Sequence, residues 1–188
     1  MGLKEGTLES LIDGGADNRA VALSVFPQML SALDRIAIAG IIHRDVKPEN
    51  ILYISHPGGQ FQFQLGDFGL SNRQVTAVTF CGTPIYMAPE MHQAGLQTSK
   101  ADVWSLFVTM LWTLDIRRFR QTQFNTAQDA QSAALYAASH EDQVSGINEM
   151  AIVNPEKRAS AAQMLVKCFN GEGLSTPWDQ IPALSINS

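Results

Sequence analysis

The sequence has few cysteines and no excess of positive charge. Its 188 residues include two cysteines, Cys81 and Cys168, which lie far apart and in no C-x-x-C or Cys/His spacing. This argues against a disulfide framework and a structural zinc site, and it favours a reducing compartment. Thirteen Lys and Arg against 18 Asp and Glu give a net charge of -5, with no basic block beyond residues 117–120. Nucleic acid is therefore not expected as a partner.

Long apolar runs are also lacking. The longest, residues 36–42 and 106–114, are shorter than the roughly 20 residues that a membrane-spanning helix needs. The N-terminus has no basic stretch followed by an apolar one, and the myristoylation pattern fails because position 6 is Gly. We therefore expect no membrane contact, and the cytoplasm or the nucleus is the default location.

What the sequence does contain suits a folded domain. Hydrophobic residues make up 45% of the chain and charged residues 16%. A chain of this length should bury roughly 70% of the surface that it exposes when unfolded, enough for one core without covalent staples. One principal domain is expected.

The spacing of apolar residues predicts a mainly α-helical fold. Apolar side chains recur at three- and four-residue intervals over residues 5–12, 18–39, 99–114, 129–139, 147–152 and 160–169. The second helix should be capped by Asn18, and Pro27 within it predicts a kink or a late start. The segment 99–114 is apolar on nearly all sides, so it should be the core helix.

A small β-hairpin is the expected β-structure. Residues 51–54 and the alternating run 61–65 read as its two strands, with residues 56–59 as the turn. Residues 66–90 show no sustained period and predict an extended functional loop. The segment after residue 170 is polar and contains proline, and Trp178 is the candidate for docking it.

Three short motifs follow one another in a fixed order. They are HRDVKPEN at residues 43–50, DFG at 67–69 and APE at 88–90. Each triplet alone occurs by chance in many proteins, but the ordered set is specific. In this order the chain resembles the eukaryotic protein kinase family, serine/threonine type. A protein-kinase-like helical lobe is the fold that this resemblance implies.

The resemblance implies ATP and Mg²⁺ as cofactors and a protein Ser/Thr hydroxyl as substrate. Asp45 would accept the hydroxyl proton, and Asn50 and Asp67 would hold Mg²⁺ through hard oxygen ligands. Lys47, two residues after Asp45, resembles the lysine that faces the transferred phosphate in Ser/Thr kinases. Leu52 resembles the residue beneath the adenine ring. A single Asp in a polar loop is more often a cap or turn residue, and only the whole motif set favours the catalytic reading.

Several residues carry expected supporting roles. The resemblance places His43 beneath the ring of Phe68, as a packing residue. Arg44 beside Asp45 resembles kinases whose activation loop is ordered by phosphorylation, with Thr79 as the first candidate phosphosite and Thr76 as the second. An unmodified, solvated threonine is the alternative at each.

Four further residues complete the expected set. Thr83 would contact Asp45 and Lys47. Glu90 should form a buried ion pair with Arg158, and Asp102 should hold the backbone of the catalytic loop from the core helix. Phe107 stands where the family usually has glycine, so helix packing there should differ.

The motif set is incomplete at its N-terminal side. The sequence contains no G-x-G-x-x-G-x-V strand-turn, no V-A-I-K lysine and no helix glutamate to pair with that lysine. We therefore expect residues 1–170 to form a kinase-like C-terminal lobe, from hinge to last helix, followed by a tail at 171–188. The face bearing Leu52 and Phe68 should be exposed and should attract an N-lobe or a partner protein. Three readings stay open: an N-terminally truncated kinase, an inactive kinase-like scaffold, and a split kinase that needs an N-lobe in trans.

Overall fold

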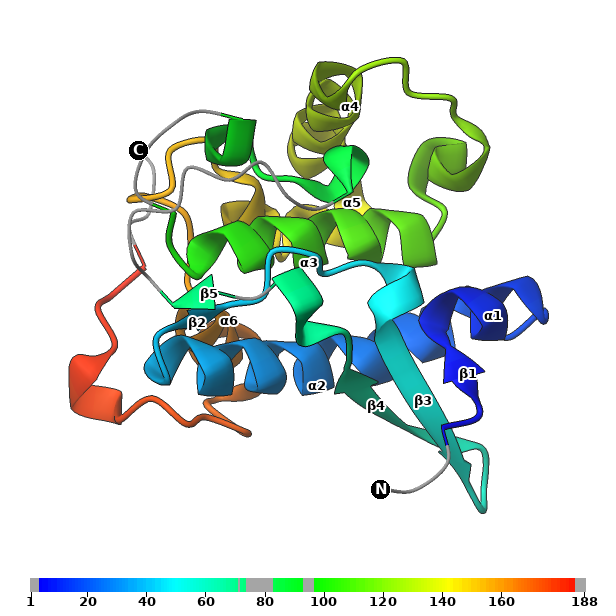
Figure 1. Ribbon diagram of the computed structural model, residues 1–188, viewed down its shortest axis with the longest axis horizontal. Helices are drawn as coiled ribbons and strands as arrows, with labels where there is room; N and C mark the ends of the chain where they lie inside the picture. Colours follow the sequence, from blue (N-terminus) through cyan, green and yellow to red (C-terminus); the bar gives the residue numbers. More distant parts are fainter. Residues whose placement is uncertain (1–3, 71, 74–82, 93–96, 185–188) are drawn as a thin grey trace.

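Two helices, α2 (Asn18–Ile38) and α3 (Lys100–Thr113), pack against each other at the centre of the fold (Figure 1). The computed structural model describes residues 4–70, 72–73, 83–92 and 97–184. Helix α2 also contacts α6 (Ala161–Phe169) and strand β4 (Gln60–Leu65). Within the described chain, α2 is the one helix long and apolar enough to cross a membrane, but its contacts on three sides are those of a core helix.

Helix α2 differs from the expectation at two points. Its N-cap is Asp17 and not Asn18: the Asp17 carboxylate accepts a hydrogen bond of 2.6 Å from the backbone N–H of Ala20. The helix also runs through Pro27 without a late start. The proline removes the N–H that would bond the Leu23 carbonyl. Because the Leu23 side chain is 71% exposed, this turn faces solvent, where water can satisfy a carbonyl.

Helix α3 is the core helix, as its apolar composition predicts. Every residue from 101 to 111 is buried. Its buried hydroxyls do not lack partners, because Thr109 and Thr113 each donate 2.8 Å hydrogen bonds to the carbonyl four residues earlier. Such bonds let a polar side chain sit in an apolar helix without an unsatisfied group.

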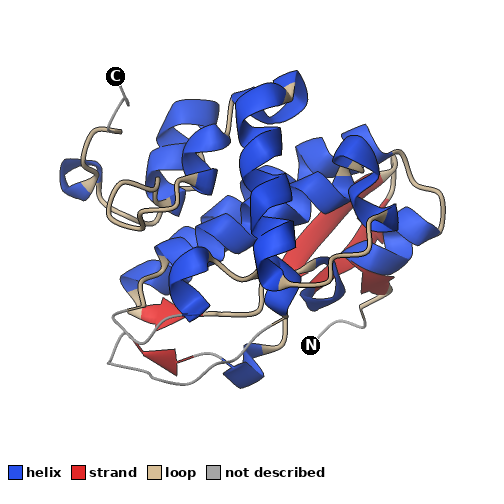
Figure 2. Ribbon diagram, turned by 90° about the horizontal axis from the view of Figure 1, so that it is seen from above, coloured by secondary structure: helices blue, strands red, loops and turns tan. Residues whose placement is uncertain are grey.

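The predicted hairpin forms the larger part of the β-structure (Figure 2). Strand β3 (Ile51–His56) pairs with β4 in antiparallel register, Ile51 opposite Leu65, and β1 (Gly6–Thr7) adds to its other edge. The turn depends on Gly58 and Gly59, whose φ values are 90° and 75°. A second, two-stranded sheet joins β2 (Ile41–Ile42) to β5 (Asn72–Arg73).

A glutamine on α2 fastens the hairpin to the helical core. Gln28 donates a 3.0 Å hydrogen bond from its amide nitrogen to the Phe61 carbonyl and accepts one of 2.8 Å from the Phe63 N–H. These bonds satisfy backbone groups on the outer edge of β4, which would otherwise remain open for pairing. The hairpin is thus fixed by a side chain as well as by its apolar face.

The remaining predicted helices lie where the sequence pattern places them, but one of them is a 3₁₀ helix and not an α-helix. Helices α1 (Leu8–Asp13), α4 (Ala127–His140) and α6 begin at capping boxes, and α5 (Asp142–Ser145) is short and was not predicted. Within residues 147–152, predicted as an α-helix, the structure has a 3₁₀ helix at Asn148–Ala151. The described 3₁₀ helices are Pro48–Asn50, Phe68–Leu70, Pro84–Tyr86, Pro89–His92, Ile116–Gln121, Asn148–Ala151 and Trp178–Gln180.

The tail after α6 packs on the core, and Trp178 contributes little to this packing. The ring lies beside Gly171 at the end of α6, but the residue is 61% exposed. Asn170, Gly171 and Gly173, with φ values of 51°, 80° and 80°, reverse the chain after α6. The tail then runs past the C-terminal end of α2 (Figure 1), where Asp34 binds its backbone.

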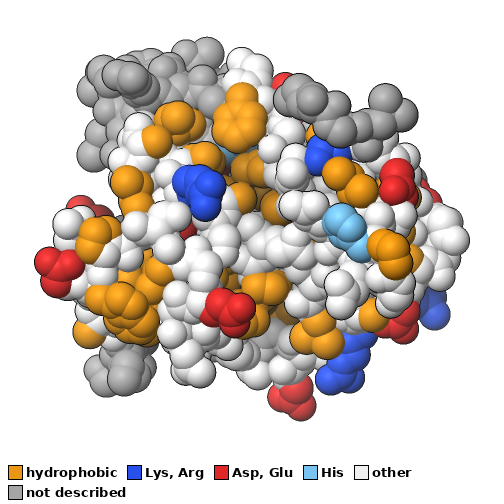
Figure 3. Space-filling model, turned by 90° about the horizontal axis from the view of Figure 1, so that it is seen from below, with side chains coloured by type: hydrophobic (Ala, Val, Ile, Leu, Met, Phe, Trp, Pro, Cys, Tyr) orange, Lys and Arg blue, Asp and Glu red, His pale blue; other side chains and the backbone are white. Residues whose placement is uncertain are grey.

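Large apolar side chains on the surface are dispersed. Among the residues that the structure describes, the exposed ones are Leu23, Ile38, Phe68, Tyr136, Val153 and Trp178. On the face seen from below, apolar side chains occupy several separate places with charged side chains between them (Figure 3). Single exposed apolar residues of this kind are normal for a folded protein.

Candidate functional site

The carboxylate of Asp45 lies at the centre of a network of side chains. Its Oδ1 accepts hydrogen bonds of 3.1 Å from both the N–H and the hydroxyl of Thr83. Its Oδ2 lies 3.1 Å from the Nζ of Lys47 and accepts a 2.8 Å bond from the amide of Asn50. Lys47 also donates to the Thr83 hydroxyl at 2.7 Å, which closes the network. The motif at 43–50 and the distant Thr83 therefore meet at one carboxylate.

This network keeps Asp45 ionised. Burial is the largest single influence and raises the pKa of the carboxyl, but the bond and charge of Lys47 and the bonds from Asn50 and Thr83 together outweigh it. The net result is a pKa of Asp45 below its ordinary value. A carboxylate in this state can accept a hydrogen bond from an incoming hydroxyl at neutral pH.

The backbone before Asp45 is held by Asp102 of α3. One Asp102 oxygen accepts the N–H of His43 and the other that of Arg44, both at 2.8 Å. Arg44 adopts a φ of 71°, a conformation that costs free energy in a residue with a side chain. Burial raises the pKa of Asp102 to about 6, although the two N–H bonds act in the opposite direction.

Gly66 joins the segment 43–50 to the end of the hairpin, a role that the sequence reasoning missed. The pairing of Ile51 with Leu65 places Asn50 opposite Gly66, whose N–H donates a 2.8 Å bond to the Asn50 carbonyl. The Gly66 carbonyl lies 2.8 Å from the Nε2 of His43. A Cβ at this position would lie 2.9 Å from a methyl carbon of Leu52, so a larger residue would require the Leu52 side chain to shift. The available signal was the glycine directly before Asp67.

Asp67 and Phe68 follow this junction. Asp67 has a φ of 52°, and its Oδ1 accepts a 3.1 Å hydrogen bond from the Gly69 N–H. The ring of Phe68 meets His43 edge to face, with centroids 4.8 Å apart, and is 48% exposed. Burial lowers the pKa of His43. His43 is therefore positioned as a neutral packing residue, and Leu52 lies half-buried on β3 beside the junction.

Asn50 and Asp67 fit the requirements of a magnesium ion. The Asn50 amide nitrogen donates to both the backbone carbonyl and the carboxylate of Asp45, at 2.8 Å each, so its oxygen is the group left to act as a ligand. Asp67 is exposed and adds a carboxylate. No cluster of three His, Cys, Asp or Glu occurs in the described part of the chain. Two protein oxygens suit Mg²⁺, which usually retains waters and phosphate oxygens as its other ligands.

Arg158 and Glu90 form a bidentate ion pair. The guanidinium makes two parallel bonds to the carboxylate, of 2.6 and 2.8 Å, and its side chain is fully buried. Its remaining N–H groups donate to the carbonyls of Ile152, Lys100 and Val153. The pair fixes the APE segment against α3, in which Phe107 is completely buried.

The segment between the DFG and APE motifs is described only in part. Thr76, Thr79 and Cys81 lie outside the described residues. Thr83 is described and belongs to the Asp45 network. After it, the Tyr86 carbonyl accepts a 2.8 Å hydrogen bond from Ser105, which attaches this segment to α3. The serine was not singled out by its sequence, because it reads as one polar residue in an apolar helix.

The ordered motifs at 43–50, 67–69 and 88–90, with Lys47, Asn50 and Thr83 gathered at Asp45, are those of the protein kinase domain class. The chain matches the protein kinase domain family over residues 3–170, and it belongs to that family.

Serine/threonine kinases are among its relatives. It is 33% identical to serine/threonine-protein kinase DCLK2 of Rattus norvegicus over 162 residues, which are 80% of this chain and 20% of the relative. It is 32% identical to serine/threonine-protein kinase DCLK1 of the same species over 158 residues, which are 78% of this chain and 36% of the relative. It is 36% identical to calcium/calmodulin-dependent protein kinase type 1 of Macrobrachium nipponense over 102 residues, which are 53% of this chain and 29% of the relative. The chain thus spans about a fifth to a third of the length of these relatives.

Proposed function

We propose that this chain is the catalytic lobe of a protein serine/threonine kinase, which transfers the γ-phosphate of ATP to a Ser or Thr hydroxyl of a protein. The observation that carries the proposal is the Asp45 carboxylate, held between Lys47, Asn50 and Thr83. Asp45 orients the incoming hydroxyl and takes its proton, and the ammonium of Lys47 faces the negative charge of the transferred phosphate. Asn50 and Asp67 would hold Mg²⁺, which would supply positive charge against the phosphates.

The proposal includes a cover over the exposed side of the site. Phe68 is 48% exposed although it packs on His43, and it lines a cavity of about 300 Å³ with Ile36 and Leu65. The sequence has neither the glycine-rich strand-turn nor the lysine strand that contact ATP phosphates in protein kinases. We infer that a β-rich lobe, in a longer form of the chain or in a second polypeptide, covers this face during catalysis.

Phosphate transfer to a Ser/Thr peptide tests the function directly. The chain is assayed with Mg²⁺ and ATP, alone and with an added polypeptide that carries a glycine-rich loop and a lysine strand. We expect transfer to Ser/Thr peptides and not to the matched Tyr peptide. Asp45→Asn should lower kcat/KM by about 10²–10⁴-fold, because it removes the proton acceptor.

Two outcomes separate the proposal from the scaffold reading. Equal transfer by the parent chain and Asp45→Asn would show that the activity does not come from this site. Absence of both transfer and Mg²⁺-ATP binding, with and without the added polypeptide, would favour an inactive binding module. Activity that appears only with the added polypeptide identifies a split kinase. Circular dichroism of Asp45→Asn controls for loss of the fold.

A further inference from the structure

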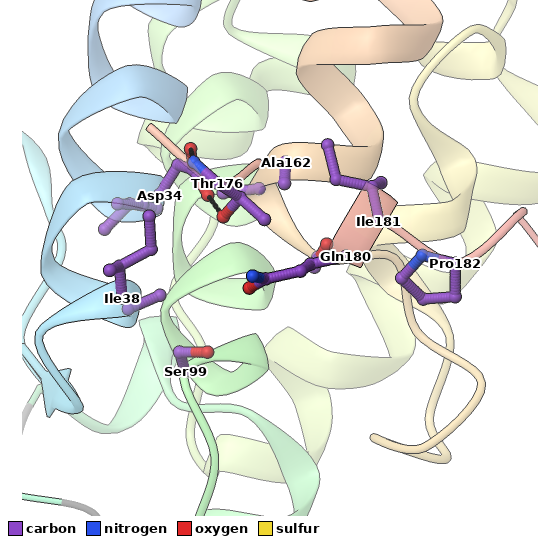
Figure 4. A pocket seen from close by; sticks show the side chains of 12 residues that line it. Asp34, Ile38, Ser99, Ala162, Thr176, Gln180, Ile181 and Pro182 are labelled. Atoms are coloured by element: carbon purple, nitrogen blue, oxygen red, sulfur yellow. Dashed lines mark hydrogen bonds between the residues drawn. The ribbon is translucent and has the colours of Figure 1, made fainter. Parts of the chain in front are cut away.

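The tail that follows α6 is attached to the core through one buried carboxylate. Asp34 of α2 is only 2% exposed, and its Oδ2 accepts the backbone N–H groups of Ser175 at 2.7 Å and Thr176 at 2.9 Å. Its Oδ1 accepts a 2.5 Å hydrogen bond from the Thr176 hydroxyl (Figure 4). Every described hydrogen-bond donor to this carboxylate therefore belongs to the tail.

A second contact holds the tail further along. The amide nitrogen of Gln163 in α6 donates to the carbonyls of Pro182 and Ala183, at 2.9 and 3.2 Å. Between the two attachments the tail lines one side of a cavity of about 230 Å³, whose other side includes Ile38 of α2 and Ala162 of α6 (Figure 4). No Lys or Arg is present among the described residues that line it.

We propose that Thr176 is a phosphorylation site and that its modification releases the tail from Asp34. Thr176 is half-buried and is followed by Pro177 in an extended conformation, with φ -56° and ψ 139°. A Ser/Thr kinase that requires proline after the acceptor would recognise this dipeptide. Its donor is ATP: the Thr176 oxygen bonds to the γ-phosphorus, the bond from that phosphorus to the bridging oxygen breaks, and ADP leaves. The hydroxyl proton passes to the base of the modifying kinase.

The release follows from the charges that would meet at Asp34. A phosphate adds a charge of about -1.5 to -2 and replaces the hydroxyl donor by acceptor oxygens. It would then face the Asp34 carboxylate, which is shielded from water, with no Lys or Arg among the described residues that line the cavity. A phosphate on Thr176 is thus incompatible with the closed state of the tail, in which Thr176 is bonded to Asp34. Because the hydroxyl is engaged by Asp34 in the closed tail, modification takes place while the tail is open and then traps that state.

Release would change the surface of the molecule and not only the tail. The side of the cavity formed by α2 and α6 is largely apolar, with residues such as Leu33, Ala37, Ala161 and Ala162. Opening the tail exposes this side beside Ile38, which is already 53% exposed. The inference does not depend on the proposed kinase activity, because the tail lies on α2 and α6 and not on the Asp45 network.

Phosphorylation and amide hydrogen exchange test the proposal together. The folded chain is incubated with a proline-directed Ser/Thr kinase and ATP, and the modified peptide is identified by mass spectrometry. We expect phosphate on Thr176 in the parent chain. Phosphorylation should be lost in Thr176→Val and in Pro177→Ala. It should be retained in Ser175→Ala, because that substitution leaves the backbone N–H unchanged. Exchange of the Ser175 and Thr176 amides should rise at least tenfold after modification.

The role of Asp34 has its own readout. The kinase should phosphorylate Thr176 several-fold faster in Asp34→Asn than in the parent chain, because the tail of the variant opens more often. The control variant Asp13→Asn, at an exposed position, should be phosphorylated at the same rate as the parent chain. If Asp34→Asn does not fold, Thr176→Val and the phosphorylated parent chain still test the attachment. The proposal is overturned if the kinase modifies a free peptide of residues 171–184 but not the folded chain. It is equally overturned by phosphate on Thr176 with unchanged amide exchange.

Discussion

Asp102 accepts the backbone N–H of Arg44 at 2.8 Å and so holds that residue at a φ of 71°. The carboxylate is buried, and its described hydrogen-bond donors are the backbone amides of His43 and Arg44, with the charge of Arg44 as a smaller influence. Neutral donors compensate only part of the cost of burying a charge. This explains why the pKa of Asp102 rises to about 6 even though both oxygens are bonded.

The first prediction concerns the pH dependence of stability through Asp102. Between its ordinary pKa of 3.8 and about 6, the native state keeps the proton that the unfolded state has lost. The contribution of Asp102 is therefore largest below pH 3.8 and falls as pH rises through about 6. Urea titration gives the free energy of unfolding of the parent chain and of Asp102→Asn. The value for the parent chain minus that for the variant should be about 2 kcal/mol smaller at pH 7 than at pH 4. A difference that stays constant with pH would contradict this.

Burial should decide how much each of two ion pairs of the same length contributes to the free energy of unfolding. Glu90 to Arg158 and Glu149 to Lys167 both measure 2.6 Å, but Arg158 is fully buried and Lys167 is 32% exposed. Glu90→Ala leaves a buried guanidinium without its carboxylate, so we expect a loss of about 3–5 kcal/mol. Glu149→Ala should cost about 0–1 kcal/mol. Denaturant titration measures both, and equal losses would refute the role of burial.

His43 should titrate below its ordinary range. Its ring is buried against Phe68 and bonded to the Gly66 carbonyl, and burial lowers its pKa from 6.5. On acidification the unfolded state binds this proton first, so the His43 contribution is present above pH 6.5 and is lost as pH falls below it. NMR titration of the ring protons, assigned with His43→Gln, measures the midpoint. A midpoint at or above 6.5 would show that the ring is solvated.

The sequence predicts the local parts of the site better than the contacts between them. The 43–50 motif, the core helix and the hairpin follow from residue order and spacing, because each is a local pattern. The placement of Asn50 beside Gly66 follows from hairpin register, which the motif alone does not specify. Local patterns are visible in one sequence, whereas register is fixed only when the strands pair.

Other features depend on long-range contacts that carry no local signal. Asp34 and Thr176 are separated by 142 positions, and the buried aspartate looks in sequence like one polar residue of an amphipathic helix. Gln28 likewise reads as a surface residue until β4 lies beside it. Proline at position 27 was expected to disturb α2, but tertiary packing on three sides outweighs the lost hydrogen bond.

The last prediction separates the charge of Lys47 from its packing. The hydrogen bond and the charge of Lys47 are the largest influences that lower the pKa of Asp45, so Lys47→Met should raise that pKa towards and above its ordinary value. NMR titration of the Asp45 carboxyl carbon detects this change whether or not the preparation is active. In an active preparation, kcat/KM should fall about 10²–10³-fold, as for loss of a donor that stabilises developing charge, and the acidic limb of its pH profile should move to higher pH. The exposed Lys157→Met is the matched control and should change neither quantity. If the Asp45 titration were the same in Lys47→Met, the 3.1 Å contact between the two side chains would have no electrostatic role, and the assignment of Lys47 to the site would have to be withdrawn.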